Sequence, residues 1–155
     1  MNFRVSGLPL GEFQPLFALS DSQLAEQHIV RQVADRPGAF PCRVSLRDAE
    51  VGERLLLLNY EHLAVPTPFR SRHAIFVRES ATEAHPEVNE VPEMLARRLL
   101  SIRAFDDGGT MLDAEVVPGN EAVPVIRRLL GDAKVAYLHA HNAKHGCFFA
   151  RIDRS

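Results

Sequence analysis

The sequence contains only two cysteines and two lysines among its 155 residues, and it has no long apolar run. Two cysteines, with no secretion signal at the N-terminus, indicate reduced thiols in a cytoplasmic protein rather than a disulfide framework. Apolar runs such as residues 55–58 are far shorter than the ~18 residues that a membrane-spanning helix requires. We therefore expect a cytoplasmic protein with no membrane segment and no structural disulfide.

The sequence signatures of the common nucleotide-binding, hydrolase and metal-binding classes are also missing. The chain has neither glycine-rich phosphate-binding pattern, GxxxxGKS/T or GxGxxG, and no GxSxG, HExxH or CxxC motif. The net charge of -2 and the lack of a basic stripe interleaved with aromatic residues argue against a nucleic-acid partner. Whether the protein is an enzyme stays open at this level.

The hydrophobic pattern predicts a small α+β protein. With 46% hydrophobic and 25% charged residues, the chain has the size and composition of one globular domain over residues 1–155. About six to eight strands are predicted, at residues 3–8, 29–33, 54–62, 73–79, 99–105, 110–117, 135–141 and 147–152. Hairpins dominate and no βαβ order repeats, so we expect a mainly antiparallel sheet.

Two short helices have identifiable start signals. Ser20, with Gln23 three residues later, forms a capping box for a helix that runs to about His28. Asn120 is the expected N-cap of a second helix over residues 121–130, which has helical apolar spacing and which Gly131 ends. The acidic, proline-containing stretch 80–92 is expected to be a surface loop.

The C-terminal stretch 135–152 carries several side chains that are able to do chemistry. It is typical of two strands joined by the polar link 142–146, whose Asn and Gly residues favour a hairpin. Strand alternation places Tyr137, His139 and His141 on one face. A five-residue link would set His141 opposite Cys147 on that face, whereas a shift by one residue would move Cys147 to the other face.

Two kinds of chemistry are expected if the five-residue link is correct. Imidazole and thiolate ligands suit zinc, so the candidate metal ligands are His139, His141, His145 and Cys147. Cys147 beside His141 has the ingredients of a nucleophile and its base, and these two are the candidate catalytic residues. The competing interpretations are hydrogen-bonded strand histidines and a cysteine that packs as a small hydrophobe. No cofactor other than zinc is expected.

An anion-binding site is the third hypothesis, because the planar guanidinium of arginine suits carboxylate and phosphate groups. We expect a small anionic or polar ligand where the C-terminal hairpin meets two upstream loops, with the candidates Cys42, Arg43, Arg70, His139, Asn142 and Arg151. Arg70 follows a stiff Pro-Thr-Pro-Phe loop, whereas Arg47 is better explained by solvation or local ion pairs. The alternative is a non-catalytic interaction module, or a homo-oligomer, that uses a sheet edge.

Three segments carry a resemblance to a known family: FPCRVSLRDAEVGERLLLL at residues 40–58, PFRSRHAIFV at 68–77 and NAKHGCFFARIDR at 142–154. In them the chain resembles a bacterial family of single-domain proteins of about this length, known as a domain of unknown function. The resemblance implies a bacterial, intracellular, single-domain protein. It brings no activity, cofactor or catalytic residue, so the hypotheses above rest on the residues themselves.

Overall fold

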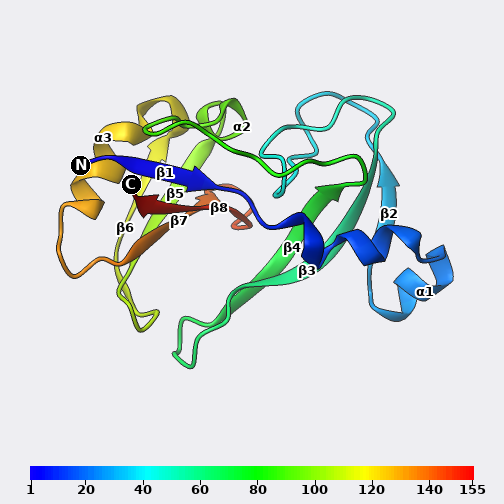
Figure 1. Cartoon of the computed structure of the whole chain (residues 1–155), viewed down its shortest axis with the longest axis horizontal. Coiled ribbons are helices and arrows are strands. Elements are labelled where there is room, and N and C mark those ends of the chain that lie inside the picture. Colours follow the sequence, from blue (N-terminus) through cyan, green and yellow to red (C-terminus); the bar gives the residue numbers. More distant parts are fainter.

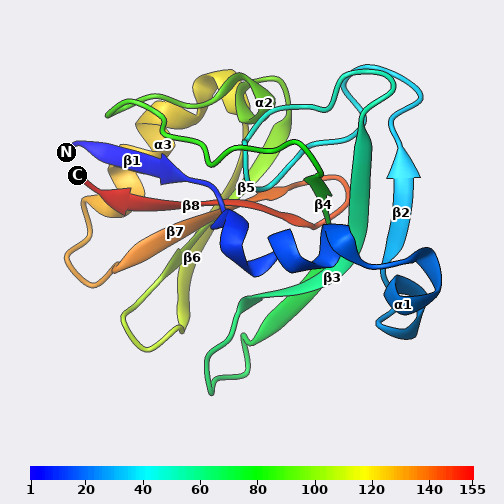
Figure 2. The ribbon, with the colours of Figure 1, turned by 45° about the vertical axis from the view of Figure 1, so that its right-hand side comes forward.

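The computed structural model describes residues 1–155 and contains eight strands in two antiparallel sheets, which lie beside each other (Figures 1 and 2). The five-stranded sheet has the order β1-β8-β7-β5-β6, with the bounds Phe3–Ser6, Phe148–Arg154, Tyr137–Asn142, Leu99–Phe105 and Met111–Pro118. The three-stranded sheet has the order β2-β3-β4, with the bounds Val30–Val33, Arg54–Leu63 and Ser71–Arg78. The predicted α+β class with mainly antiparallel sheet is confirmed.

Short helices complete the fold: α1 (Asp21–Glu26), α2 (Glu93–Ala96), α3 (Ala122–Leu130), and the 3-10 helices η1 (Leu10–Glu12), η2 (Gln14–Ala18) and η3 (Gly119–Glu121). The capping box of α1 is confirmed. The N–H of Gln23 donates to Oγ of Ser20 (3.2 Å), and the N–H of Ser20 donates to Oε1 of Gln23 (2.9 Å). No helix in the chain is long and apolar enough to cross a membrane.

The predicted N-cap at Asn120 is wrong, because the chain enters α3 through η3, which contains Asn120. The first turn of α3 therefore has no side-chain cap. Gly119 explains this entry: a Cβ there would lie 2.0 Å from the carbonyl oxygen of Leu95 in α2. Close packing of α2 against η3 thus decides where α3 begins, and local capping preference does not.

Each sheet has its own hydrophobic core. Helix α3 packs its apolar face, including Ile126 and Leu129, against the five-stranded sheet in a core of 21 buried residues. A second core of ten buried residues joins the three-stranded sheet to the N-terminal helical segment through Phe13 and Leu24. Burying one large apolar side chain stabilises a fold by about 1.5–3 kcal/mol, so each sheet is held by its own packing.

The segment 40–48 connects the two sheets. Cys42 forms an isolated parallel bridge with Phe76 of β4, while Nε of Arg43 donates to the carbonyl oxygen of Phe148 in β8 at 2.8 Å. Gly7 is required where the N-terminal segment passes this connection, because a Cβ there would lie 2.5 Å from a backbone carbonyl oxygen. Residues 45–48, the last part of this segment, are thereby held at the junction of the sheets.

Candidate functional site

The C-terminal hairpin has a four-residue link instead of the predicted five-residue link. The N–H of Asn142 donates to the carbonyl oxygen of Cys147 (2.8 Å), which leaves residues 143–146 as the link. The Asn142 side-chain oxygen accepts two further backbone N–H groups of the link, and Gly146 supplies a φ of 83°. His141 therefore lies opposite Phe148, and the predicted register is wrong by one residue at this position. A further register shift between Ala140 and His141 sets His139 opposite Arg151.

This register separates the candidate nucleophile from its candidate base. Cys147 is buried in the core of the five-stranded sheet, whereas the His141 ring packs against Phe148, with centroids 5.8 Å apart. His145 is exposed in the link, so the four predicted metal ligands do not meet. No group of three or more His, Cys, Asp or Glu side chains is arranged to hold a metal ion. The structure therefore brings neither the Cys147–His141 pair nor the predicted ligand set together, because the observed register turns Cys147 away from His141.

A third histidine, which the sequence hypothesis did not include, joins two of the predicted ones. The ring of His62, near the end of β3, lies 6.0 Å from that of His139 and 4.9 Å from that of His141, centroid to centroid. The Phe148 ring stacks on His62 at 5.3 Å. Since β3 and β7 belong to different sheets, these three residues, called the histidine cluster below, bridge the two sheets.

Burial keeps the histidine cluster uncharged near neutral pH. Desolvation lowers the pKa of His62 to about 4, and the pKa values of His139 and His141 to about 3. The nearby guanidinium of Arg103 lowers all three pKa values further. A hydrogen bond between Nδ1 of His141 and the carbonyl oxygen of Gly146 (2.9 Å) acts the other way on the pKa of His141. The neutral rings therefore carry unprotonated nitrogens.

The polar atoms of the histidine cluster are not satisfied by the protein. Nδ1 of His62, Nδ1 of His139 and Nε2 of His141 are buried and have no hydrogen-bond partner. No other buried side-chain nitrogen or oxygen atom of the chain lacks a partner. Each unpaired buried polar atom lowers the free energy of unfolding by about 1–3 kcal/mol, and three such atoms lie together in this cluster.

Arg103 of β5 borders the histidine cluster and has no carboxylate partner. Its Nε donates to Oγ of Ser101 (3.1 Å), and burial lowers its pKa. Arg151 of β8, a predicted ligand-binding residue, lies opposite His139, but its guanidinium donates to Asp153 at 2.8 Å. Arg103 is therefore the uncompensated cation at this position.

Arg43 is brought close to both cysteines, as the sequence hypothesis required. Its buried guanidinium donates to the carbonyl oxygens of Pro41 (2.5 Å) and Phe148 (2.8 Å). Burial lowers the pKa of Arg43 to about 10, and the sulfurs of Cys147 and Cys42 act in the opposite direction. Both thiols are free. Two of its N–H groups donate to backbone carbonyls on the two sides of the junction, and the side chain is 2% exposed, so Arg43 joins the sheets and is not accessible to a ligand.

Arg70 lies elsewhere, and the predicted meeting of its loop with Cys147 is wrong. Its exposed side chain forms an ion pair with Glu61 at 2.9 Å. The loop that carries Arg70 joins β3 to β4 and packs on the β5–β6 turn, where Oγ1 of Thr67 donates to the carbonyl oxygen of Gly109 (3.1 Å). That turn lies beside the start of β7, whereas Cys147 follows its end.

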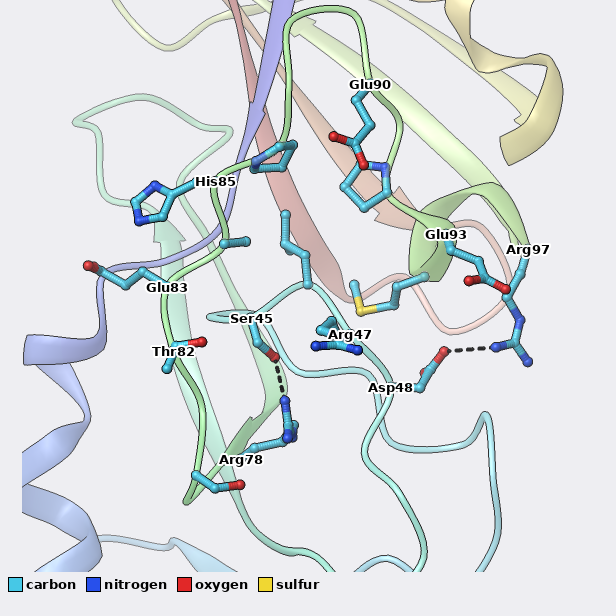
Figure 3. Close-up of a pocket in the computed structure, with 16 residues that line it drawn as sticks. Ser45, Arg47, Asp48, Arg78, Thr82, Glu83, His85, Glu90, Glu93 and Arg97 are labelled. Carbon is cyan, nitrogen blue, oxygen red and sulfur yellow. Dashed lines mark hydrogen bonds and ion pairs between the residues drawn. The ribbon is translucent and has the colours of Figure 1, made fainter.

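A cavity of about 770 Å³ lies between residues 45–48 and residues 78–97 (Figure 3). Its volume falls in the range of about 300–1,000 Å³ that is typical of small-molecule sites. Only three of its 16 lining residues are hydrophobic. The stretch predicted to be a surface loop, residues 80–92, forms one wall of this polar cavity.

Several charged side chains of the cavity wall are already paired. Arg78 donates to the Glu53 carboxylate at 2.5 Å and to Oγ of Ser45 at 3.2 Å. Arg97 lies 3.5 Å from the carboxylate of Asp48 (Figure 3). These contacts hold Arg78 and Arg97 in place and neutralise much of their charge.

Arg47 differs from these arginines, because it is exposed and forms no ion pair. Figure 3 shows it on the cavity wall between Ser45 and Asp48, with Glu90 across the cavity and Glu93 to one side. The side chain of Glu93, at the start of α2, also forms no ion pair. The cavity therefore presents a free guanidinium together with unpaired carboxylate charge.

Sequence reasoning missed His62 and Arg103, and it explained Arg47 by solvation or local ion pairs; the structure shows an exposed side chain with no ion pair. Simple alternation would put His62 on the face of Leu56, Leu58 and Tyr60, which packs in the core of the three-stranded sheet. The pairing register of β3 shifts between Tyr60 and Leu63, and His62, within this irregular part, contacts the histidine rings of β7 instead. Nothing in the sequence indicates this shift. Arg47 lacked any local signal, because its lack of a partner depends on residues 30 to 50 positions away.

The fold and the cavity define an α+β protein with two antiparallel sheets and a polar cavity of about 770 Å³ beside their junction. The chain belongs to the family described as "Protein of unknown function (DUF1203)", whose model matches residues 39–154. The resemblance to a family of unknown function is thereby confirmed, and the matched range includes both the cavity and the histidine cluster. No curated protein and no solved structure matches the chain.

Proposed function

We propose that this protein binds a small polar molecule carrying an anionic group in the cavity between residues 45–48 and 78–97. The observation that supports the proposal is the exposed guanidinium of Arg47, which has no ion-pair partner in the cavity wall. A guanidinium offers a planar fork of N–H donors that matches a carboxylate or phosphate group. The predicted ligand class is retained, while the proposed position moves from the hairpin to this cavity.

The other charges of the cavity narrow the class of ligand. Glu83, Glu90 and Glu93 line the same space, so a second anionic group on the ligand would be repelled. Hydroxyl groups of Ser45, Ser80 and Thr82 add further hydrogen-bonding partners. A zwitterion, such as an amino acid, complements this lining best, with its carboxylate on Arg47 and its ammonium group towards the glutamates. A bacterial, cytoplasmic setting belongs to the same proposal, supported by two free thiols.

Binding can be tested with a panel of amino acids, hydroxy acids and dicarboxylates, using thermal shift and calorimetry. We expect an amino acid to bind, and Arg47→Gln to weaken it by about tenfold or more, the cost of a charge-assisted hydrogen-bonded pair. Arg127→Gln, which changes an exposed arginine on α3, is the matched control and should leave affinity unchanged. Equal binding by Arg47→Gln, or no binding by any member of the panel, would refute the proposal.

A second candidate function is protein interaction through a sheet edge. Strand β2 is an edge strand, and it exposes Val30 and Val33 by 52% and 57%. Exposed apolar residues on an unpaired edge favour strand addition by a partner or by a second copy. The solution molar mass at rising concentration tests self-association: a dimer that Val33→Lys converts to a monomer would support it. A wild-type protein that stays monomeric argues against self-association through this edge.

A further inference from the structure

The histidine cluster is a second polar site, separate from the cavity. His139 and His141 are 3% and 1% exposed, and each has one buried ring nitrogen without a hydrogen-bond partner. Buried polar atoms in native proteins are nearly always satisfied by protein, water or a bound species. The concentration of all the chain's unpaired buried side-chain atoms here, on residues from two sheets, therefore points to an occupant.

The protonation of His141 limits what that occupant can be. Its Nδ1 lies 2.9 Å from the Gly146 carbonyl oxygen, which can only accept, so Nδ1 carries the proton of the neutral ring. Nε2 then has a bare lone pair. It can bind a cation or accept a hydrogen bond in the neutral ring, and it can donate to an anion only after the ring takes up a proton.

The surrounding charges favour an anion over a cation. Apart from the histidines of the cluster themselves, the ionisable groups that act on the three histidine pKa values are Arg103 of β5, Arg151 of β8 and His73 of β4, and none of them is acidic. Asp106, Asp107 and Asp153 act on Tyr137 at the start of β7, and Glu61, next to His62 in β3, is paired with Arg70. Arg151 is neutralised by Asp153, whereas Arg103 has only a serine hydroxyl as partner. A metal ion would be repelled by Arg103, and the histidine nitrogens are not arranged to hold one.

We propose that Arg103, His62 and His141 form an inter-sheet site for a small oxyanion, a carboxylate or phosphate group, whose binding is coupled to protonation of the histidines. The guanidinium supplies the permanent charge, and Oγ of Ser101 lies beside it. Arg103 and His62 are only partly buried, and they provide the approach from solvent. Each imidazolium that forms takes one proton from solvent and gives Nε2 or Nδ1 a hydrogen to donate to the anion.

The sign of the pH dependence distinguishes an anion from a metal. Proton uptake on binding means that the affinity for an anion rises as the pH falls. A metal competes with protons for the same nitrogens, so its affinity falls as the pH falls. The inference is independent of the cavity, because it uses neither Arg47 nor any residue of the cavity wall.

The test uses inorganic phosphate and the full chain carrying Arg47→Gln, so that binding in the cavity does not contribute. Calorimetry in buffers of different ionisation enthalpy should show proton uptake, and phosphate should bind more tightly at about pH 6 than at about pH 7.5. Nitrogen-detected NMR of the histidine rings should show His62 or His141 becoming imidazolium when phosphate is added. Arg103→Gln should weaken binding by about tenfold or more, while the exposed control Arg72→Gln should not.

The proposal is overturned if phosphate binds equally to the Arg103→Gln variant, or if it binds without proton uptake. It is also overturned if Zn²⁺ binds at one equivalent and does so more weakly as the pH falls, because the site is then a metal site. Arg103→Lys keeps the charge and guards against misfolding of the first variant: partial retention of phosphate binding is expected. Free phosphate and a phosphate or carboxylate group of a larger molecule are told apart by comparing inorganic phosphate with phosphate monoesters and acetate.

Discussion

In the cavity, arginines and carboxylates face each other in contact with solvent, whereas in the histidine cluster the arginine faces neutral rings in a buried space. Arg78 and Arg97 of the cavity each have an acidic partner, at 2.5 Å and 3.5 Å. Arg103 beside the cluster has none, and three ring nitrogens near it have no partner at all. Carboxylates thus neutralise Arg78 and Arg97 in the cavity wall, where Arg47 alone is unpaired, whereas no carboxylate neutralises Arg103 beside the histidine cluster.

The difference shows which region is costly to the fold. The Arg97–Asp48 pair of the cavity wall is exposed on its arginine side and contributes about 0–1 kcal/mol, whereas the Arg78–Glu53 pair is largely buried and belongs to the fold. Arg47, which is exposed and unpaired, can change with little effect on stability. Unpaired buried atoms cost about 1–3 kcal/mol each, so the histidine cluster lowers the stability of the native state. The histidine cluster is a candidate for a functional role because it lowers the stability of the native state. The role of the cavity has to be tested by ligand binding, because stability does not reveal it.

The largest expected effect comes from Arg43, which joins the sheets on which both regions depend. Arg43→Met should lower the free energy of unfolding by about 2–4 kcal/mol, because the carbonyl groups of Pro41 and Phe148 lose their donor. Urea denaturation followed by circular dichroism measures this change. The exposed Arg127→Met should change stability by less than about 0.5 kcal/mol. A change of that small size at Arg43 would show that the junction does not rely on its guanidinium.

Acid should destabilise the protein through the histidine cluster. The folded pKa values of His139 and His141, about 3, lie below the ordinary value of 6.5, so the unfolded state binds more protons between these limits. Stability is therefore full above about pH 6.5 and falls as the pH drops towards 3, by about 2–4 kcal/mol at pH 5. Unfolding curves from pH 7.5 to 5 measure the slope. A double variant, His139→Phe with His141→Phe, should flatten it, and an unchanged slope would place the acid sensitivity elsewhere.

Removing one unpaired nitrogen should stabilise the fold. His139 is surrounded by the rings of Phe105, Tyr137 and Phe148, with centroids 5.0–5.2 Å away, so a phenyl ring fits the same environment. His139→Phe should raise the free energy of unfolding at pH 7 by about 1 kcal/mol. Thermal and urea denaturation measure the gain, with the exposed His145→Phe as control. A loss of stability instead would mean that His139 has a native partner such as an ordered water.

The smallest effect on stability is expected at Arg47 in the cavity. Arg47→Gln should change the free energy of unfolding by less than about 0.5 kcal/mol, because the side chain is exposed and unpaired. Arg47→Gln should change ligand affinity alone, whereas Arg43→Met should change the stability of the fold. Urea denaturation checks the first expectation. A destabilisation of more than about 1 kcal/mol would mean that Arg47 has a structural role, and the contrast between the two regions would weaken.

The predicted elements agree well with the structure wherever the determining interaction is local. The capping box of Ser20 and Gln23 needs only residues of one turn, and the turn at residues 106–109 needs only its own glycines and aspartates. The prediction at Asn120 failed because the packing of Gly119 against α2 replaced local capping. The hairpin register failed because Asn142 pairs with Cys147 and extends β7, and because the pairing shifts again between Ala140 and His141.

Of the predictions about the site residues, some agree with the structure and others do not. The sequence placed His139 and His141 on one face and brought Arg43 to both cysteines, and both features are present. The sequence could not show that His62 and Arg103 lie beside His139, because the three residues belong to strands that pair or pack only in the folded chain. The position of Arg70 also depended on where a whole loop docks.

The sequence by itself determined the α+β class, the strands and the family of unknown function, because alternation, turn residues and motif segments act over a few neighbouring positions. Only the tertiary structure decided which side chains face one another, since this depends on strand register and on the docking of one sheet against another. A one-residue change of register sent Cys147 into the core, and the approach of β3 to β7 completed the histidine cluster.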